Sequence, residues 1–131
     1  MIAFTKAYGS KLQIIGDDYL VTNPDLVKQA IAEKATNAVL IKVNQIGTIT
    51  EAVEAFKTAQ SGDFGTIVSA RSGETEDITI SHLAVGLGAG QFKVGSFQRS
   101  ERMVKWNEIL RIEEQLGTNT FVGAKPLKRP A

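Results

Sequence analysis

Short apolar runs alternate with longer segments of helical pattern four times along the chain. Apolar runs of this length, bounded by turn residues, are typical of β-strands, and the longer segments carry helix-capping signals. The pattern predicts strands at residues 12–15, 39–42, 66–69 and 92–94, and helices at residues 24–34, 48–60, 76–87 and 100–116.

Strands that alternate with helices of this length indicate βαβ units, in which right-handed crossovers build a parallel sheet. Two architectures satisfy the pattern: an open doubly wound sheet, and part of a (β/α)₈ barrel. A complete barrel takes ~250 residues, so four βα units in a chain of 131 residues would form half of one. The pattern alone does not choose between the two.

Composition excludes several classes of partner and site. The formal net charge of +1 gives no case for nucleic acid or an anionic membrane surface. The chain has no cysteine and a single histidine, His82, which excludes disulfides, thiolate chemistry and multi-histidine metal sites.

One domain is expected over residues 1–117, followed by a C-terminal tail over residues 118–131. The basic cluster at residues 125–129 is expected to be frayed and solvated. No apolar run approaches the ~20 residues that cross a membrane, and the N-terminus lacks the layout of a signal peptide. A cytoplasmic location is therefore expected.

Polar residues that could carry chemistry close the predicted strands or directly follow them. They are Asp17, Lys42, residues 69–72 and Lys93. A barrel would bring all of them to its C-terminal face, where barrel enzymes keep their active sites.

Each of these residues also has an ordinary structural explanation. Asp17 follows a glycine, and Gly-Asp pairs favour turns, while a lysine at a strand end is commonly a solvated charge. The functional interpretations are a carboxylate ligand for a hard cation at Asp17, a general base at Lys42, and a phosphate fork at Arg71, with Ser72 beside it just before a helix.

Seven segments of the chain together resemble one family, the enolases, in the same order and over most of the chain, from about residue 12 to residue 117. The segments are Gly16-Asp17-Asp18, Val21-Thr22-Asn23-Pro24, Leu40-Ile41-Lys42-Val43-Asn44-Gln45-Ile46-Gly47, Ser69-Ala70-Arg71-Ser72-Gly73-Glu74-Thr75-Glu76-Asp77, Gly90-Gln91-Phe92-Lys93, Arg99-Ser100-Glu101-Arg102 and Leu110-Arg111-Ile112-Glu113-Glu114.

The resemblance implies a fold, a reaction and a set of site residues. The fold would be the last four βα units of the enolase catalytic barrel, a half-barrel. The parent reaction is the Mg²⁺-dependent dehydration of 2-phosphoglycerate to phosphoenolpyruvate. Enolase-superfamily sites pair a lysine or histidine base with Mg²⁺. On this chain Lys42 would be the base, Asp17 one Mg²⁺ ligand, Arg71 and Ser72 the phosphate-binding groups, and Lys93 a group near the substrate carboxylate.

The chain departs from the family in two ways. Ala70 stands where enolases have an active-site histidine, and His82, in the following helix, does not replace it. Two of the three metal carboxylates and the general acid lie on earlier parts of the family's sequence. The isolated chain is therefore expected to be inactive.

A half-barrel also leaves unpaired strand edges, so the expected partner is the missing N-terminal enolase portion or a second copy of the chain. Two alternatives remain. One is a non-catalytic fragment that acts as a phosphoanion-binding or scaffold protein, which Ala70 favours. The other is a different enzyme of the enolase superfamily, which the blocks at residues 69–77 and 99–102 disfavour.

Overall fold

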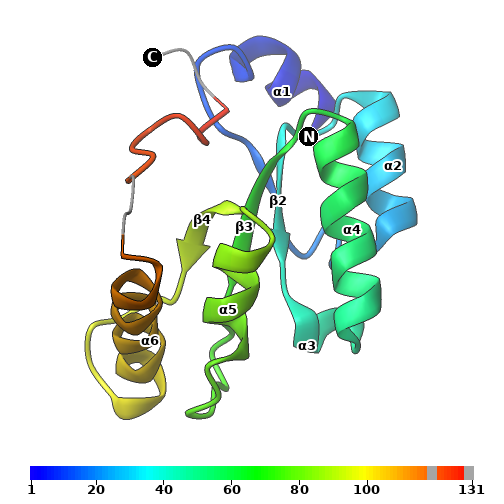
Figure 1. The fold of residues 1–131 in the computed structure, drawn as a ribbon. Helices are drawn as coiled ribbons and strands as arrows, with labels where there is room; N and C mark the ends of the chain where they lie inside the picture. The colour runs from blue at the N-terminus through cyan, green and yellow to red at the C-terminus, as the bar shows by residue number, and fades with distance from the viewer. Residues whose placement is uncertain (118–120, 129–131) are drawn as a thin grey trace.

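The computed structural model describes residues 1–117 and 121–128, and in these residues strands and helices alternate (Figure 1). The elements are α1 (Ile2–Tyr8), β1 (Ile15–Gly16), α2 (Pro24–Glu33), β2 (Ala38–Ile41), α3 (Val43–Ile46), α4 (Ile49–Ser61), β3 (Gly65–Ser69), α5 (Thr79–Gly86), β4 (Gly90–Lys93) and α6 (Ser100–Leu116).

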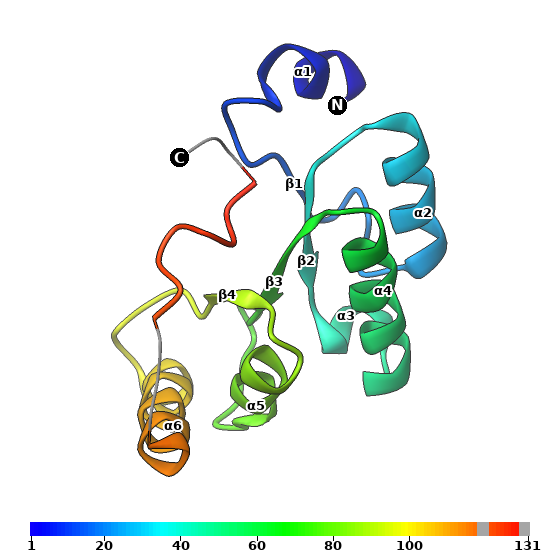
Figure 2. The same cartoon turned by 45° about the horizontal axis from the view of Figure 1, so that its top comes forward.

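The four strands form one parallel sheet in the order β1-β2-β3-β4, so each strand pairs with its neighbour along the chain. Figure 2 shows α2, α4, α5 and α6 on one side of this curved sheet. A doubly wound sheet would carry helices on both faces. The fold is therefore a partial (β/α)₈ barrel, as the resemblance implies.

The hydrophobic core lies between the sheet and its helices. Side chains of β2 alternate between the two faces: Val39 and Ile41 join the helices in the core, and Leu40 lies in a second cluster with Ile67 on the other face. The core is built from buried residues on both layers: Leu20, Val27, Ala30, Ala35, Val39, Ile41, Ala52, Ala55, Phe56, Ala59, Phe64, Val68, Ala84 and Ala89.

Capping residues fix where two of the outer helices begin. Asn23 accepts hydrogen bonds from the backbone N–H groups of Asp25 and Leu26, which starts α2 at Pro24 as its sequence predicts. Thr48 accepts from the N–H of Glu51 and so starts α4. These caps fix where the segments that follow β1 and β2 pass into the outer helices.

Two short helices, α1 and α3, are absent from the sequence prediction, and β1 begins later than predicted. The strand was expected from residue 12, but it starts at Ile15. The Asn37 side chain accepts from the backbone N–H of Ile14 at 2.6 Å and donates to the carbonyl of Leu12 at 2.9 Å. Because this amide takes the place of a neighbouring strand, regular pairing begins only after Ile14.

Residues 121–128 cross the sheet on the side opposite the helices, near the amino ends of the strands (Figure 2). The Gln91 side chain donates to the carbonyl of Pro126 at 3.0 Å, and the N–H of Lys128 donates to Gln13 at 3.1 Å. Lys128 also pairs with Asp63 at 2.5 Å. The prediction of a frayed, solvated cluster is therefore wrong for residues 126–128, whereas Lys125 is exposed and residue 129 lies outside the described residues.

Among the described helices, none is both long enough and apolar enough to cross a membrane.

Candidate functional site at the carboxyl ends of the strands

A cavity of about 590 Å³ lies at the carboxyl ends of β2, β3 and β4. It receives four of the predicted site residues because parallel strands end at the same edge of the sheet. Its lining consists of Asp18, Lys42, Ala70, Arg71, Ser72, Lys93, Val94, Gly95, Ser96, Gln98, Arg99 and Arg102.

Lys42 follows β2 directly and is the most buried of the predicted site residues, with 7% of its side chain exposed. Its ammonium group donates to the carboxylate of Asp17, at the end of β1, and lies 3.4 Å from Asp18. The fifth predicted residue, Asp17, thus joins the site through Lys42. A buried ammonium requires such partners, because desolvating an unpaired charge is costly.

Thr22 holds the backbone at Lys42. Its buried hydroxyl accepts from the N–H of Lys42 at 3.0 Å and lies 3.3 Å from the carbonyl of Leu40 and 3.2 Å from the side-chain oxygen of Gln45. Thr22 has a positive φ of 57°, an unusual conformation for a β-branched residue. This turn aims the hydroxyl at the end of β2.

Asp18 remains a carboxylate at one side of the cavity. A hydrogen bond from the Gln45 side chain, at 3.0 Å, is the largest influence that lowers the pKa of Asp18, and the charge of Lys42 acts in the same direction. This carboxylate therefore counters part of the positive charge of the lining.

Arg71 and Ser72 lie in the loop that follows β3, and Lys93 ends β4 beside them. The register of the sheet pairs Ser69 with Lys93, and the N–H of Ala70 donates to the carbonyl of Lys93 at 2.8 Å. Arg71 is half-buried, whereas Ser72 and Lys93 are exposed. Ala70 is buried against the cavity and brings no polar atom of its side chain to it.

Two further cations, Arg99 and Arg102, line the cavity from the start of α6. Sequence reasoning gave neither a role, although both lie in the segment Arg99-Ser100-Glu101-Arg102, because a helix start after a strand is not itself a strand end. With them the lining holds five cations and one carboxylate, Asp18. A concave site of this charge suits a small anion.

The carboxylates described do not make a Mg²⁺ site on their own. No group of three or more metal-ligating side chains occurs among residues 1–117 and 121–128. Asp17 is 46% exposed and already paired with Lys42. Mg²⁺ prefers several oxygen ligands in octahedral geometry, so Asp17 fits only as one ligand of a site whose other carboxylates come from elsewhere.

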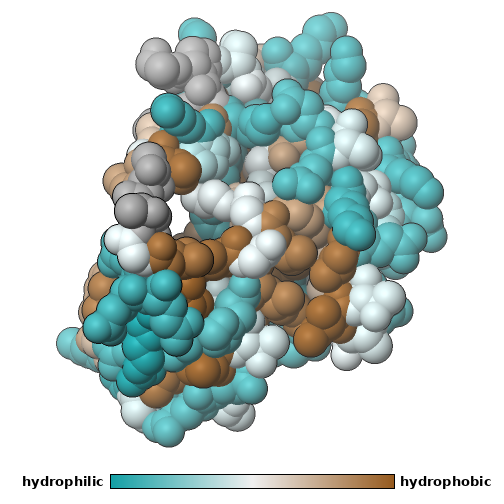
Figure 3. Space-filling model, in the orientation of Figure 1, coloured by the Kyte–Doolittle hydropathy of each residue, from teal (hydrophilic) through white to brown (hydrophobic). Residues whose placement is uncertain are grey.

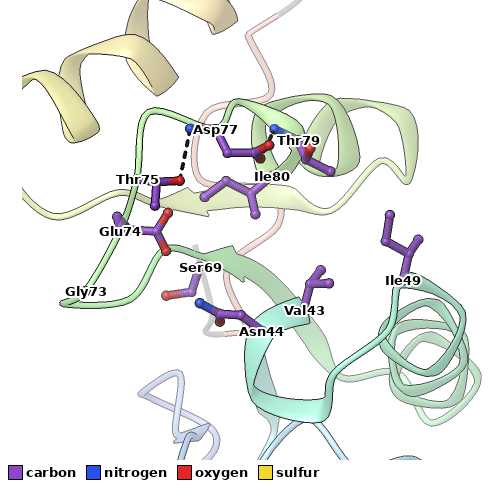
Figure 4. A pocket seen from close by; sticks show the side chains of 10 residues that line it. All are labelled: Val43, Asn44, Ile49, Ser69, Gly73, Glu74, Thr75, Asp77, Thr79 and Ile80. Carbon is purple, nitrogen blue, oxygen red and sulfur yellow. Dashed lines mark hydrogen bonds between the residues drawn. The ribbon is translucent and has the colours of Figure 1, made fainter.

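A second cavity, of about 300 Å³, lies between α3, the start of α4 and the loop before α5 (Figure 4). Apolar side chains, including Val43, Ile49 and Ile80, line much of it, and Figure 3 shows apolar surface in the same place, between α4 and α5. None of its lining residues is a cation, so it does not share the charge of the first cavity.

The parallel βα sheet, the helices on one side and the cationic site at the strand ends define the chain as part of a (β/α)₈ barrel. The family model described as the enolase C-terminal TIM barrel domain matches residues 1–129. The chain belongs to the enolase family.

Named relatives show how much of that family the chain covers. Enolase from Anaplasma marginale (strain St. Maries) is 53% identical over 92% of this chain, enolase from Eimeria tenella is 57% identical over 92%, and enolase 1 from Desulfitobacterium hafniense (strain Y51) is 54% identical over 95%. The chain spans only 27–28% of the length of these relatives.

Proposed function

We propose that this chain supplies the proton-abstracting and phosphate-binding part of an enolase active site. The reaction is the glycolytic dehydration of 2-phosphoglycerate to phosphoenolpyruvate, in the cytoplasm. The observation that supports it is the cavity in which a buried lysine, Lys42, faces four further cations. Family membership supports the identity of the reaction.

In this proposal each side chain has one task. Arg71 and Ser72 bind the phosphate, since arginine offers a planar fork of donors, and Lys93 neutralises the substrate carboxylate. Lys42 takes the proton from the carbon that carries both groups. A lysine accepts a proton only when its nitrogen is neutral, so Lys42 must first release one proton to solvent, and its ion pair with Asp17 is lost when it does.

The remaining parts of the site come from outside the chain. We assign Mg²⁺ as the cofactor and Asp17 as one of its ligands, with the other carboxylates and the general acid supplied by the N-terminal portion of an enolase or by a second copy of the chain. Without them we expect the chain to bind the substrate and not to convert it.

A second candidate function is a non-catalytic phosphoanion-binding or scaffold role. Ala70 favours it, because this buried side chain can neither titrate nor donate a hydrogen bond at the cavity. The enolase role and the phosphoanion-binding role both require anion binding, and they differ in whether a completed site turns over.

Titration of the purified chain with 2-phosphoglycerate, followed by amide NMR, tests the shared requirement. We expect the largest shifts at residues 71–73 and at Lys93. Arg71→Ala should weaken binding by at least tenfold, because a charge-assisted hydrogen bond is worth about 1.5–3 kcal/mol.

The matched control is Lys57→Ala, which removes one positive charge from an exposed position on α4, away from the cavity. It should leave the affinity unchanged. Equal loss in both variants would mean that binding reflects net charge alone, and the proposal would fail.

A further inference from the structure

Two side chains of α6 reach residues 71–75, in the loop that follows β3, from the same face of the helix. Arg102 and Lys105 are three residues apart, which puts them side by side on a helix surface. Both donate to backbone or side-chain atoms of residues 72–75. The loop that carries Arg71 and Ser72 is thus tied to α6 at two points.

Lys105 is fully buried, with 0% of its side chain exposed. Its ammonium group has three partners: the carboxylate of Glu74 at 3.0 Å and the carbonyls of Thr75 and Glu101, each at 2.8 Å. Three partners match the three protons of an ammonium group, so the buried charge is fully compensated.

Glu74 passes this constraint on to Arg71. One of its carboxylate oxygens is bound by Lys105, and the other accepts from the backbone N–H of Arg71 at 2.7 Å. The loop that contains Glu74 and Thr75 runs beside the end of β3 (Figure 4). The position of the Arg71 backbone therefore depends on the Glu74 carboxylate, which the buried Lys105 of α6 holds in place.

Arg102 joins the two loops that border the cavity. One guanidinium nitrogen donates to the carbonyl of Val94 at 2.9 Å, and another donates to the carbonyl of Ser72 at 3.1 Å. Val94 follows Lys93 directly, so this one side chain sets the spacing between Ser72 and Lys93. The planar fork of an arginine can hold two acceptors at once, which a lysine cannot do in the same geometry.

We propose that Arg102 and Lys105 are positioning residues that hold Arg71, Ser72 and Lys93 at the spacing that binds the phosphate. The effect of these two residues on anion affinity rests on the proposed function. That they hold the two loops in place rests on the described contacts alone. Pre-ordered donors bind an anion more tightly because less order is lost on binding.

The test is the charge-conserving variant Arg102→Lys. Amide hydrogen exchange in residues 71–75 and 94–96 should become faster, with exchange in α2 and α4 unchanged, because only the bridge between the two loops is lost. The dissociation constant for inorganic phosphate should rise about tenfold although the net charge is the same. Lys105→Met should accelerate exchange in residues 71–75 further.

The matched control is Arg99→Lys. Arg99 also lines the cavity, but among the described residues its side chain pairs with the carboxylate of Glu101, at 3.9 Å, and with neither loop. This variant should leave exchange in residues 71–75 unchanged. If Arg102→Lys also left it unchanged, the positioning role would be refuted, whatever the change in affinity. If the wild-type chain bound no phosphate while Arg102→Lys still loosened the loop, the proposed function would fail and the positioning of the loop would stand.

Discussion

Two buried threonines near the sheet predict opposite effects of the same chemical change. Thr22 accepts a hydrogen bond from the N–H of Lys42 at 3.0 Å. Thr36 is also buried, and among the described residues its hydroxyl is the one buried side-chain nitrogen or oxygen without a hydrogen-bond partner. Replacing each threonine by valine keeps the β-branching and nearly the same shape, and exchanges the hydroxyl for a methyl group.

The magnitudes follow from what each hydroxyl does. In Thr22→Val the N–H of Lys42 loses its acceptor in a buried place, which should cost about 1–3 kcal/mol of unfolding free energy. In Thr36→Val an unsatisfied polar group leaves the interior, so stability should stay the same or rise by about 1 kcal/mol. The unfolding free energy should therefore fall in Thr22→Val and stay the same or rise in Thr36→Val.

Urea unfolding of the purified chain, followed by circular dichroism, measures both changes. The comparison is valid if the denaturant slopes agree, since a changed slope would indicate a different unfolding transition. Equal destabilisation by the two substitutions would refute the reasoning, because it would mean that losing the hydrogen bond to Lys42 costs no more than losing the unpaired hydroxyl of Thr36.

Two further predictions concern the carboxyl-terminal segment and the response to acid. A Cβ at Gly90 would lie 2.7 Å from Pro126, whereas one at Gly88 would meet no atom, and both glycines have positive φ, so Gly90→Ala should destabilise the chain more than Gly88→Ala in thermal unfolding. A hydrogen bond from the N–H of Thr79 lowers the pKa of Asp77, so this carboxylate stabilises the fold above the unfolded pKa of an aspartate and loses that effect as the pH falls through its lowered folded value. Asp77→Asn should therefore flatten the loss of stability on acidification, and an unchanged acid profile would contradict this assignment.

The sequence predicted the central strands well because both of their faces are buried, and such strands appear in a sequence as short continuous apolar runs. β2 and β3 each lie within one residue of the predicted range, and all of their residues are buried. β1 was placed too early because the Asn37 side chain, 22 positions beyond Ile15, replaces the partner strand there. A contact of that kind leaves no periodic signal near the strand itself.

The candidate site was likewise predicted only in part. Lys42, Arg71, Ser72 and Lys93 line one cavity, as residues at the carboxyl ends of neighbouring parallel strands must. The roles of these residues remain predictions. Arg102 could not be found from strand ends, since it reaches the cavity from a helix.

Lys105 was equally hidden from sequence reasoning. A lysine within a helix reads as a solvated charge, but this one is fully buried because Glu74, Thr75 and Glu101 satisfy its three protons. Only the tertiary structure brings those acceptors together. The contacts of residues 126–128 could not be predicted for a related reason, because their partners, Gln13 and Gln91, are far away in sequence.

The most direct test of the central claim is complementation. The enolase of Anaplasma marginale, with the segment that matches this chain removed, would be combined with this chain, Mg²⁺ and 2-phosphoglycerate, and phosphoenolpyruvate would be measured. We expect product only when both polypeptides are present, its loss with Lys42→Ala, and its retention with Lys57→Ala. Absence of product from a complex that does assemble, or undiminished turnover with Lys42→Ala, would contradict the assignment of this chain as the proton-abstracting part of an enolase site.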